Sequence, residues 1–305
     1  MSQLILESML NGFQLGIALF LVASGLTLVL GILNLVNLAH GSLFMLGAYF
    51  GAFAYQQTGS FLVSLLAAFA GSAIVGLFME RIVFQALYRK DHLDQVVATF
   101  GCILFFNQLV LRLFGAKNQE LSLPASVDFP ITILGFRYPS YRLLVIAIGI
   151  ALAVTLYWMI ARTRLGMQIR AGANNREMLD ALGVDVKILY AAIVTLGAVL
   201  AGLAGILLAP IEAVESGMGE PKLLLAFVVI VIGGIGSIRG AFIASILVAY
   251  VEVFGRVFMT DLTKIVFSDS TAQMIGPALA SISTYVLMAL ILIFFPRGLF
   301  GARTG

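Results

Sequence analysis

Long apolar runs separated by short polar connections dominate the pattern of this chain. A helix that crosses the hydrocarbon layer of a membrane needs about 20 predominantly apolar residues. The first two runs are separated only by Asn34–Asn37, and the seventh and eighth only by the glycine-rich stretch Gly233–Gly240. We therefore predict about nine spans, or eight to ten if either pair is a broken or re-entrant helix. The predicted spans lie near residues 12–33, 38–55, 60–82, 95–114, 141–160, 188–209, 222–238, 240–257 and 274–296.

Composition supports this pattern and fixes the class of protein. Hydrophobic residues make up 61% of the 305 residues, charged residues make up 11%, and the mean hydropathy is +1.07. A soluble fold cannot hide so much apolar surface, because a large share of any folded surface still meets water. The alternation of apolar and polar residues that marks membrane β-barrel strands is missing from the sequence. We therefore predict an all-α polytopic membrane protein that forms a single domain over residues 1–305.

The N-terminus, the cysteine content and the net charge each argue against one feature that the protein could have had. The first residues, MSQLILESML, lack the positively charged segment of a signal peptide, so we expect none to be removed. Cys102 is the only cysteine, which excludes an intrachain disulfide. Membrane topology explains the net charge of +3 better than nucleic-acid binding does, and we expect no nucleic-acid partner.

A polar segment interrupts the apolar pattern between Arg162 and Lys187, and it holds eight of the chain's charged residues. Within it, AGANNREMLDALG (Ala171 to Gly183) predicts a short helix capped by Asn174 or Asn175 and ended by Gly183. Its apolar edge is formed by Met178, Leu179 and Leu182 at helical spacing. Such a short helix is not stable alone in water, so it either packs on a partner or belongs to a solvated surface loop.

Basic residues predict the orientation, because Lys and Arg concentrate in cytoplasmic loops. In the nine-span arrangement most of the 18 basic residues fall on the side of the polar segment, about 162–187. We therefore expect this segment and the C-terminus in the cytoplasm, and the N-terminus outside. The longest outer loop, Gly115 to Tyr141, contains three prolines and is expected to be irregular.

The first candidate for chemistry is NLVNLAHGS, which places amide, imidazole and hydroxyl groups at the edge of apolar sequence. Polar groups at membrane depth are costly unless they find partners or line a water-filled path. Asn34, Asn37 and His40 are spaced three residues apart and would share one face of a helix. They either line a translocation path, as a polar stripe or as an unwound segment, or hydrogen-bond between helices. A metal site is not expected, because His92 is the only other histidine. The path candidates are Asn34, Asn37, His40 and Ser42.

The second candidate is the glycine cluster GGIGSIRG, which allows a kink and a close approach of backbones. It either forms a hinge in the path or a tight turn between two spans. Its sequence and the residues around it also resemble an earlier stretch, so that His40 to Ala52 pairs with Ile235 to Tyr250. This pairing predicts an internal repeat of the kind found in transporters, unless small residues simply recur where helices pack closely. The hinge candidates are Gly233, Gly234, Gly236, Ser237 and Gly240.

Four segments together resemble one known family. They are GLTLVLGILNLVNLAHGSLFMLGAY, RLGMQIRAGANNREMLDALGVDVKILYAAIVTLGAVLAGLAGIL, GGIGSIRGAFIASILVAYVE and the C-terminal FFPRGLFG. They resemble the permease subunits of bacterial ABC importers for branched-chain amino acids, and the LivH-type subunit more than its LivM-type partner. The resemblance covers essentially the whole chain.

The resemblance implies an importer assembled from several chains in the bacterial inner membrane. The implied partners are two ABC ATPase subunits, a second homologous permease of the LivM type and a periplasmic substrate-binding protein. ATP and Mg would be bound by the ATPases, since this chain has no GxxxxGK[ST] motif. No cofactor or catalytic residue is expected in this chain. The short cytoplasmic helix would dock on an ATPase through Ala171, Asn175, Glu177, Ala181 and Gly183.

Two other classes compete with this prediction. An ion-coupled secondary transporter usually carries ionisable groups deep in the membrane, and the predicted spans are nearly free of them. A membrane enzyme would need motifs such as HExxH or GxSxG, which the sequence lacks. Within the importer prediction, an ABC permease for urea or amides is the alternative to one for branched-chain or related small amino acids.

Overall fold

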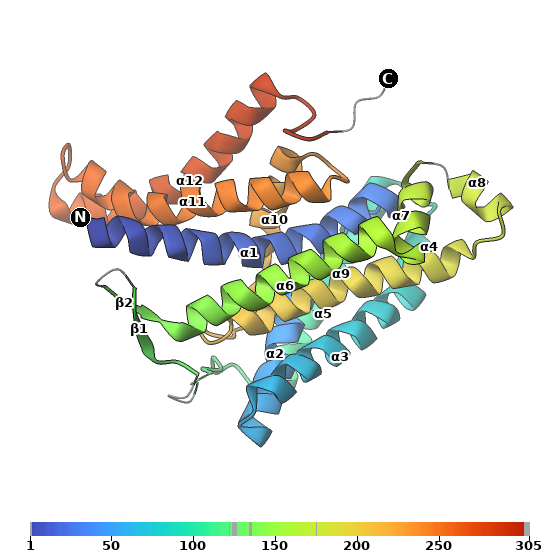
Figure 1. Cartoon of the computed structure of the whole chain (residues 1–305), viewed down its shortest axis with the longest axis horizontal. Coiled ribbons are helices and arrows are strands. Elements are labelled where there is room, and N and C mark those ends of the chain that lie inside the picture. The colour runs from blue at the N-terminus through green and yellow to red at the C-terminus, as the bar shows by residue number, and fades with distance from the viewer. Residues whose placement is uncertain (1, 122, 124–126, 134–135, 175, 302–305) are drawn as a thin grey trace.

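The computed structural model describes residues 2–121, 123, 127–133, 136–174 and 176–301. It is a bundle of long helices that run roughly along the longest axis of the molecule (Figure 1). In the described chain, seven helical segments are long and apolar enough to cross a membrane. The seven are α1 (Ser2–Leu33), α3 (Phe61–Met79) with its continuation to Leu87, α5 (His92–Phe114), α6 (Ser140–Arg162), α9 (Val186–Leu208), α11 (Ile238–Thr263) and α12 (Asp269–Phe294).

The two ends of the bundle carry different small elements (Figure 1). One end, called the hairpin end, holds the antiparallel strands β1 (Pro130–Ile133) and β2 (Phe136–Pro139). The opposite end, called the α8 end, holds α7 (Arg164–Asn174) and α8 (Arg176–Ala181). We expected the loop after Gly115 to be irregular, but part of it forms this hairpin. Pro130 begins β1 and Pro139 ends β2, and the two residues pair with each other across the hairpin.

Helices α1 and α9 form the centre of the bundle. In their most apolar windows 78% of α1 and 83% of α9 are buried, against 11% for α12, which lies at the periphery. The two central helices cross at Gly25 and Gly197, where an added Cβ atom would meet the backbone of the other helix. Small residues of this kind let membrane helices approach closely, and van der Waals packing then holds them together.

Two shorter helices, α2 (His40–Thr58) and α10 (Gly219–Gly233), begin inside the bundle. Each follows a non-helical segment, 34–39 or 209–218, that turns back from the end of the preceding long helix. Their first turns meet at Gly41 and Gly219, where neither backbone leaves room for a side chain. Counting each returning segment with its helix as one passage, the described chain crosses the bundle nine times. This confirms an all-α polytopic protein with broken spans.

The packing relates α1–α3 to α9–α11, and this correspondence differs from the predicted repeat. Helix α1 packs along α11, and α9 packs along α3. In the chain, α2 comes directly after the central helix α1, and α10 comes directly after the central helix α9. This arrangement makes α10 the counterpart of α2. The sequence pairing instead matched α2 with Ile235 to Tyr250, which covers the turn before α11 and its first half. The two stretches share a Gly-Ser at a helix start, which explains their similarity.

Candidate functional site

The segment between α1 and α2 runs back into the bundle without forming a helix. Helix α1 ends at Leu33, and Asn34 follows with a φ of 52°, a left-handed conformation that asparagine tolerates better than most residues. At the far end of the segment, His40 Nε2 lies 3.0 Å from the carbonyl oxygen of Val22. Val22 lies eleven residues before Leu33, so the segment returns by about 16 Å at 1.5 Å per residue.

Side chains of α5 hold this returning segment. The backbone N–H of Val36 donates to Gln95 Oε1 at 3.0 Å, and that of Leu38 donates to Thr99 Oγ1 at 3.2 Å. Gln95 and Thr99 are almost fully buried. Non-helical backbone at membrane depth is tolerated only where protein or water satisfies its polar groups. Gln95 and Thr99 meet that requirement, although nothing in the sequence pattern singles out either residue.

Asn34, Asn37 and His40 do not share one helix face, and of the two predicted forms the structure has an unwound segment rather than a helical stripe. Asn34 and Asn37 precede α2 in non-helical backbone, because the chain must reverse direction there. Asn34 is exposed at the α8 end, whereas Asn37, His40 and Ser42 are buried inside the bundle. The structure therefore brings Asn37, His40 and Ser42 into one region and leaves Asn34 outside it.

Buried polar atoms without partners gather in this region. Among the described residues, Asn37 Nδ2 and Oδ1 and His40 Nδ1 make no hydrogen bond. Buried polar groups are nearly always paired, and each exception calls for an explanation such as a water molecule, an ion or a functional role. The region lies next to the meeting point of the first turns of α2 and α10. Discontinuous helices that meet near the membrane centre are where transporters place their substrate paths.

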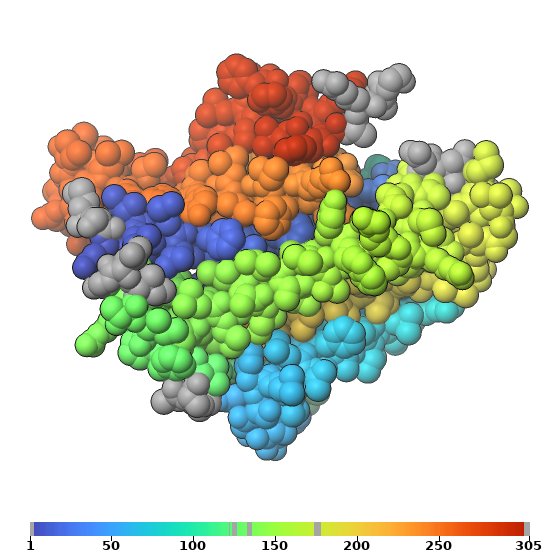
Figure 2. Space-filling view, viewed as in Figure 1, coloured from blue at the N-terminus to red at the C-terminus, as the bar shows by residue number. Residues whose placement is uncertain are grey.

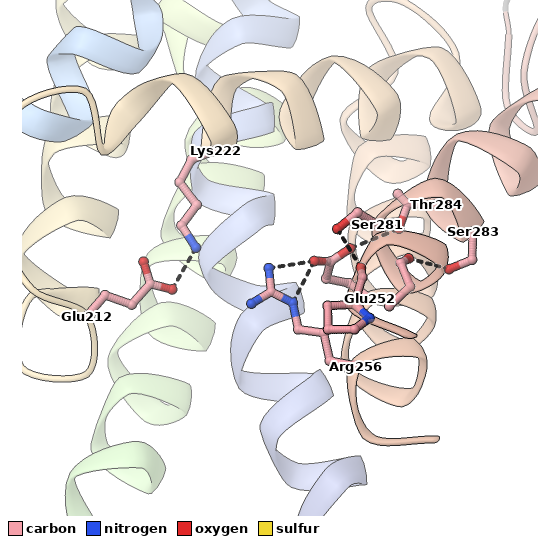
Figure 3. A network of polar contacts seen from close by, with 9 residues as sticks. Glu212, Lys222, Glu252, Arg256, Ser281, Ser283 and Thr284 are labelled. Atoms are coloured by element: carbon pink, nitrogen blue, oxygen red, sulfur yellow. Dashed lines mark hydrogen bonds and ion pairs between the residues drawn. The ribbon is translucent and has the colours of Figure 1, made fainter. Parts of the chain in front are cut away.

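A second polar group lies at the start of α10. Asn107 on α5 donates through Nδ2 to Glu220 Oε1 at 2.6 Å, and Glu220 is exposed on the side of the bundle. On another side of α10, Lys222 Nζ lies 2.6 Å from Glu212 Oε1 (Figure 3). These residues did not stand out in the sequence, because Glu212 and Glu220 fall between the predicted spans 188–209 and 222–238. Their spacing before an apolar run gives no sign that the loop returns into the bundle.

Figure 3 also shows an ion pair within α11 whose buried carboxylate, Glu252, is bonded by α12 as well. Glu252 accepts from Arg256 at 2.7 Å, and the hydroxyl of Thr284 donates to its other oxygen at 3.0 Å. The carboxylate is thus satisfied by two helices, and this explains how the peripheral α12 is held to α11. Part of the pairing was readable in the sequence, since Glu252 and Arg256 are four residues apart on one helix.

The predicted hinge glycines form a closely packed corner. Gly233 at the end of α10 lies against Gly240 in the first turn of α11, and Gly234 and Gly236 adopt left-handed φ values of 95° and 81°. Ser237 caps α11 by accepting from the N–H of Gly240 at 3.0 Å. The final segment of the chain joins this corner, since the N–H groups of Leu299 and Phe300 donate to Ile232 and Gly233. Motion at these glycines stays a prediction.

The predicted coupling helix is α8, which begins at Arg176, directly after the predicted cap positions, and ends at Ala181. A separate helix, α7, occupies the first part of the polar segment, so Ala171 lies on α7 and Ala181 ends α8; both are exposed. Gly183 has a φ of 81° just after α8, as its predicted role as a helix terminator requires. Asn175 lies outside the described residues, as does the side chain of Glu177.

Helix α8 presents apolar side chains to the exterior while one side chain anchors it. Met178 of α8 is 59% exposed, and Leu182, directly after the helix, is 74% exposed. Leu179 is buried and packs with Leu189 of α9 beside Gly172 of α7. An exposed apolar pair on a short helix outside the main bundle is typical of a surface that another protein covers.

Contacts connect the α8 region to the returning segment. Tyr88 packs edge-on against Tyr190 of α9 at 5.0 Å between ring centroids, and its hydroxyl donates to the buried Glu80 at 3.4 Å. Glu80 opens a π-helical turn, η1 (Glu80–Phe84), which α4 (Gln85–Leu87) continues. Gln95 donates to the carbonyl oxygens of Leu87 and Lys90 at 3.4 and 3.3 Å. The same side chain thus touches the end of α4 and the segment that leads to His40.

The described side chains offer no site for a metal ion, since no three His, Cys, Asp or Glu residues among them come together. At the hairpin end, polar contacts serve to fasten the hairpin to α1. Tyr138 and Arg142 both donate to Asn11 Oδ1, at 3.0 and 2.6 Å. Burial raises the pKa of the Tyr138 phenol, and the neighbouring Arg142 opposes that shift.

Comparison with known proteins gives a consistent result. Residues 8–296 match the profile of a family described as the permease component of branched-chain amino acid transport systems. The high-affinity branched-chain amino acid permease protein BraD of Pseudomonas aeruginosa is 29% identical over 97% of this chain and 95% of its own length. The corresponding LivH protein of Escherichia coli K12 is 27% identical over the same shares.

A more distant relative carries a different name. The autoinducer 2 import permease LsrC of Yersinia pestis is 27% identical over 77% of this chain and 66% of its own length. No solved structure matches the chain.

Proposed function

The chain belongs to the family of branched-chain amino acid transport system permease components, and we propose that it carries branched-chain or related small amino acids across the membrane. It is a multi-pass permease subunit of an ABC importer, and such importers work with ATPase and substrate-binding partners. The observation that carries the choice of substrate is that the BraD and LivH relatives match nearly the full length of both chains.

We infer the assembly from the same relationship. Two ATPase subunits bind the cytoplasmic side, a second permease of the LivM type completes the membrane core, and a periplasmic protein delivers the substrate. The ATPases hold ATP and Mg, and this chain is not itself catalytic. The α8 end, with its arginines and the C-terminal segment, faces the cytoplasm of a bacterial inner membrane.

Docking on an ATPase fits the shape of α8. A helix with the exposed side chains of Met178 and Leu182 offers an apolar contact, while Leu179 transmits any displacement of α8 to α7 and α9. The contacts through Tyr88 and Gln95 then lead to the returning segment and to His40. A permease whose conformation is changed by ATPases needs no ionisable group in its translocation path, because ATP hydrolysis outside the membrane supplies the energy for transport.

Transport assays with reconstituted vesicles test this function. The chain, its permease partner and the ATPases are incorporated in proteoliposomes with the binding protein outside, and uptake of labelled leucine is measured. We expect uptake only with ATP, undiminished when an ionophore collapses ion gradients. Uptake that follows an ion gradient without ATP would identify a secondary transporter. Labelled urea and acetamide in the same vesicles show whether amides are the true cargo.

The role of His40 in the path has its own test. His40→Ala removes the contact with the Val22 carbonyl, which also accepts a bond within its own helix, so folding should survive. We expect uptake to fall about tenfold, or ~1.4 kcal/mol in the barrier, with normal assembly of the complex. The control is Ser245→Ala, since this buried hydroxyl bonds only to Phe242 of its own helix. If uptake by His40→Ala is unchanged, His40 has only a structural role and does not contribute to the translocation path.

A further inference from the structure

Two adjoining cavities open on the side of the bundle near the α8 end. One has a volume of about 440 Å³ and the other about 420 Å³, and both are lined by Tyr157, Ile238 and Arg239. They lie where α6 and α11 flank α1, and Figure 2 shows the blue surface of α1 between green α6 and orange α11. Neither cavity touches the region around Asn37 and His40.

The second cavity is an apolar groove. Phe20 of α1 and Phe242 of α11 pack edge to face at its base, with ring centroids 5.2 Å apart. Only Tyr157 and Arg239 contribute polar groups to its lining. Its walls face outward, since Val154 is 61% exposed and Ile243 is 46% exposed. The lined stretch of α6, from Ile150 to Tyr157, extends about 10 Å along the helix axis at 1.5 Å per residue. In a membrane, a hydrocarbon chain fills such a groove.

The first cavity, at the α8 end of the groove, is positively charged, although much of its lining is apolar. Its charged and polar lining residues include Arg170, Arg239 and Ser237, the last of which caps the N-terminus of α11. A helix N-terminus carries a partial positive charge and favours anions. Among the described residues neither arginine lies within ion-pairing distance of a carboxylate. Two cations and a helix N-terminus thus surround one space.

The arginines are held in place by neutral groups. Arg239 donates to the Tyr157 hydroxyl at 3.1 Å and lies over the same ring, 5.7 Å from its centroid. Arg170 donates to the carbonyl oxygen of Ile160. These contacts position the guanidinium groups, and the part of the chain that the structure describes places no carboxylate beside them to balance their charge.

A buried hydroxyl in the same cavity also lacks a partner. Thr27 of α1 lines the cavity and is 1% exposed, and its Oγ1 makes no hydrogen bond within the described chain. Most buried hydroxyl groups are paired. A bound group with acceptor oxygens would satisfy Thr27 and the arginines together.

We propose that this pair of cavities binds one anionic phospholipid, with its phosphate between Arg170, Arg239 and the start of α11 and one acyl chain in the groove. Basic pockets between membrane helices on the cytoplasmic side suit acidic headgroups. The groove suits a hydrocarbon chain, and the arginines suit a negatively charged headgroup. A free phosphate would leave the groove empty, and an uncharged lipid would leave the arginines without an anion. The bound lipid links α6 to α11 across α1.

Native mass spectrometry of the full-length chain tests the site. Detergent-purified protein is mixed with phosphatidylglycerol or with phosphatidylcholine of identical acyl chains, and bound lipid is counted as collision energy rises. We expect one phosphatidylglycerol to be retained more strongly than phosphatidylcholine. Arg239→Gln and Arg170→Gln should each weaken the retained lipid about fivefold, as expected for one basic residue at a lipid headgroup. Lys90→Gln, an exposed basic residue elsewhere at the α8 end, is the matched control and should change nothing.

A second variant tests the groove. Ala153→Phe places a ring where the acyl chain lies, so it should abolish tight retention while both arginines remain. Some variants will be less stable than the unmodified protein. For each variant, the thermal unfolding temperature is therefore measured with and without added phosphatidylglycerol, so that stabilisation by the lipid is compared within the same protein. Equal retention of the two lipids, full retention in Arg239→Gln or Ala153→Phe, or equal stabilisation by inorganic phosphate without lipid would each overturn the proposal.

Discussion

Gln95 connects parts of the chain that hydropathy alone would place in separate helices. Its oxygen accepts from Val36, and its nitrogen lies near the carbonyl oxygens of Leu87 and Lys90. An apolar replacement would leave a buried N–H unpaired, which costs about 1–3 kcal/mol. From the sequence this residue was an unremarkable amide at the start of a span. Nothing local to it shows that the backbone 59 residues earlier needs an acceptor.

Replacement of Gln95 by leucine should therefore lower both stability and transport. We expect Gln95→Leu to destabilise the folded chain by about 1–3 kcal/mol and to reduce ATP-driven uptake. Thermal unfolding of the detergent-solubilised protein and vesicle uptake are the measurements. Gln108→Leu is the control, because this amide lies on the same helix and is exposed. A Gln95→Leu protein as stable and active as the control would contradict the assigned contacts.

At the scale of elements, α8 illustrates what sequence patterns do and do not show. The end of the helix was predicted, because glycine alone adopts a positive φ at little cost and Gly183 does so at 81°. The start was also predicted, since α8 begins at Arg176, directly after the candidate caps Asn174 and Asn175, whereas the separate helix α7 before it was not predicted. Only contacts such as Leu179 and Leu189 beside Gly172 fix the break between the two helices.

The conformation of Gly183 makes its replacement a sharp test of coupling. An added Cβ atom meets no other atom within 4 Å, so the main cost of Gly183→Val is backbone strain of about 1–3 kcal/mol. We expect normal insertion, weakened ATPase association and loss of ATP-driven uptake. Gly59→Val is a matched control, since Gly59 also has a positive φ and open space but lies beyond α2. Equal behaviour of the two variants would show that strain alone, and not docking at α8, explains any loss.

For the whole molecule, the positions of the spans were largely predictable and their paths were not. Apolar runs mark α3, α5, α6 and α9 to within about three residues, because lipid imposes a minimum apolar length. Hydropathy does not tell a helix that crosses fully from a segment that turns back, as 34–39 and 209–218 do. The candidate site lies where these returning segments meet, so its composition was only partly predicted.

The proposed orientation makes a prediction about the entire chain. In a Cys102→Ser background, which removes the only cysteine, single cysteines are introduced at Ala181 and at Thr132. A membrane-impermeant maleimide added to intact cells lacking an outer membrane should label Thr132→Cys and leave Ala181→Cys unlabelled. Labelling of Ala181→Cys should appear once the cells are opened. The reverse pattern would place α8 outside and exclude its docking on cytoplasmic ATPases.

The returning segment 34–39 has a consequence for how the protein is made. Its N–H groups depend on Gln95 and Thr99, which follow 59 and 61 residues later in the chain. Helices α1, α2 and α3 therefore leave the ribosome before those acceptors exist, and lipid offers no substitute for them. The insertion machinery must shelter this part of the nascent chain until α5 arrives. Synthesis that stops before residue 95 leaves a fragment that quality-control proteases can recognise by its unpaired backbone.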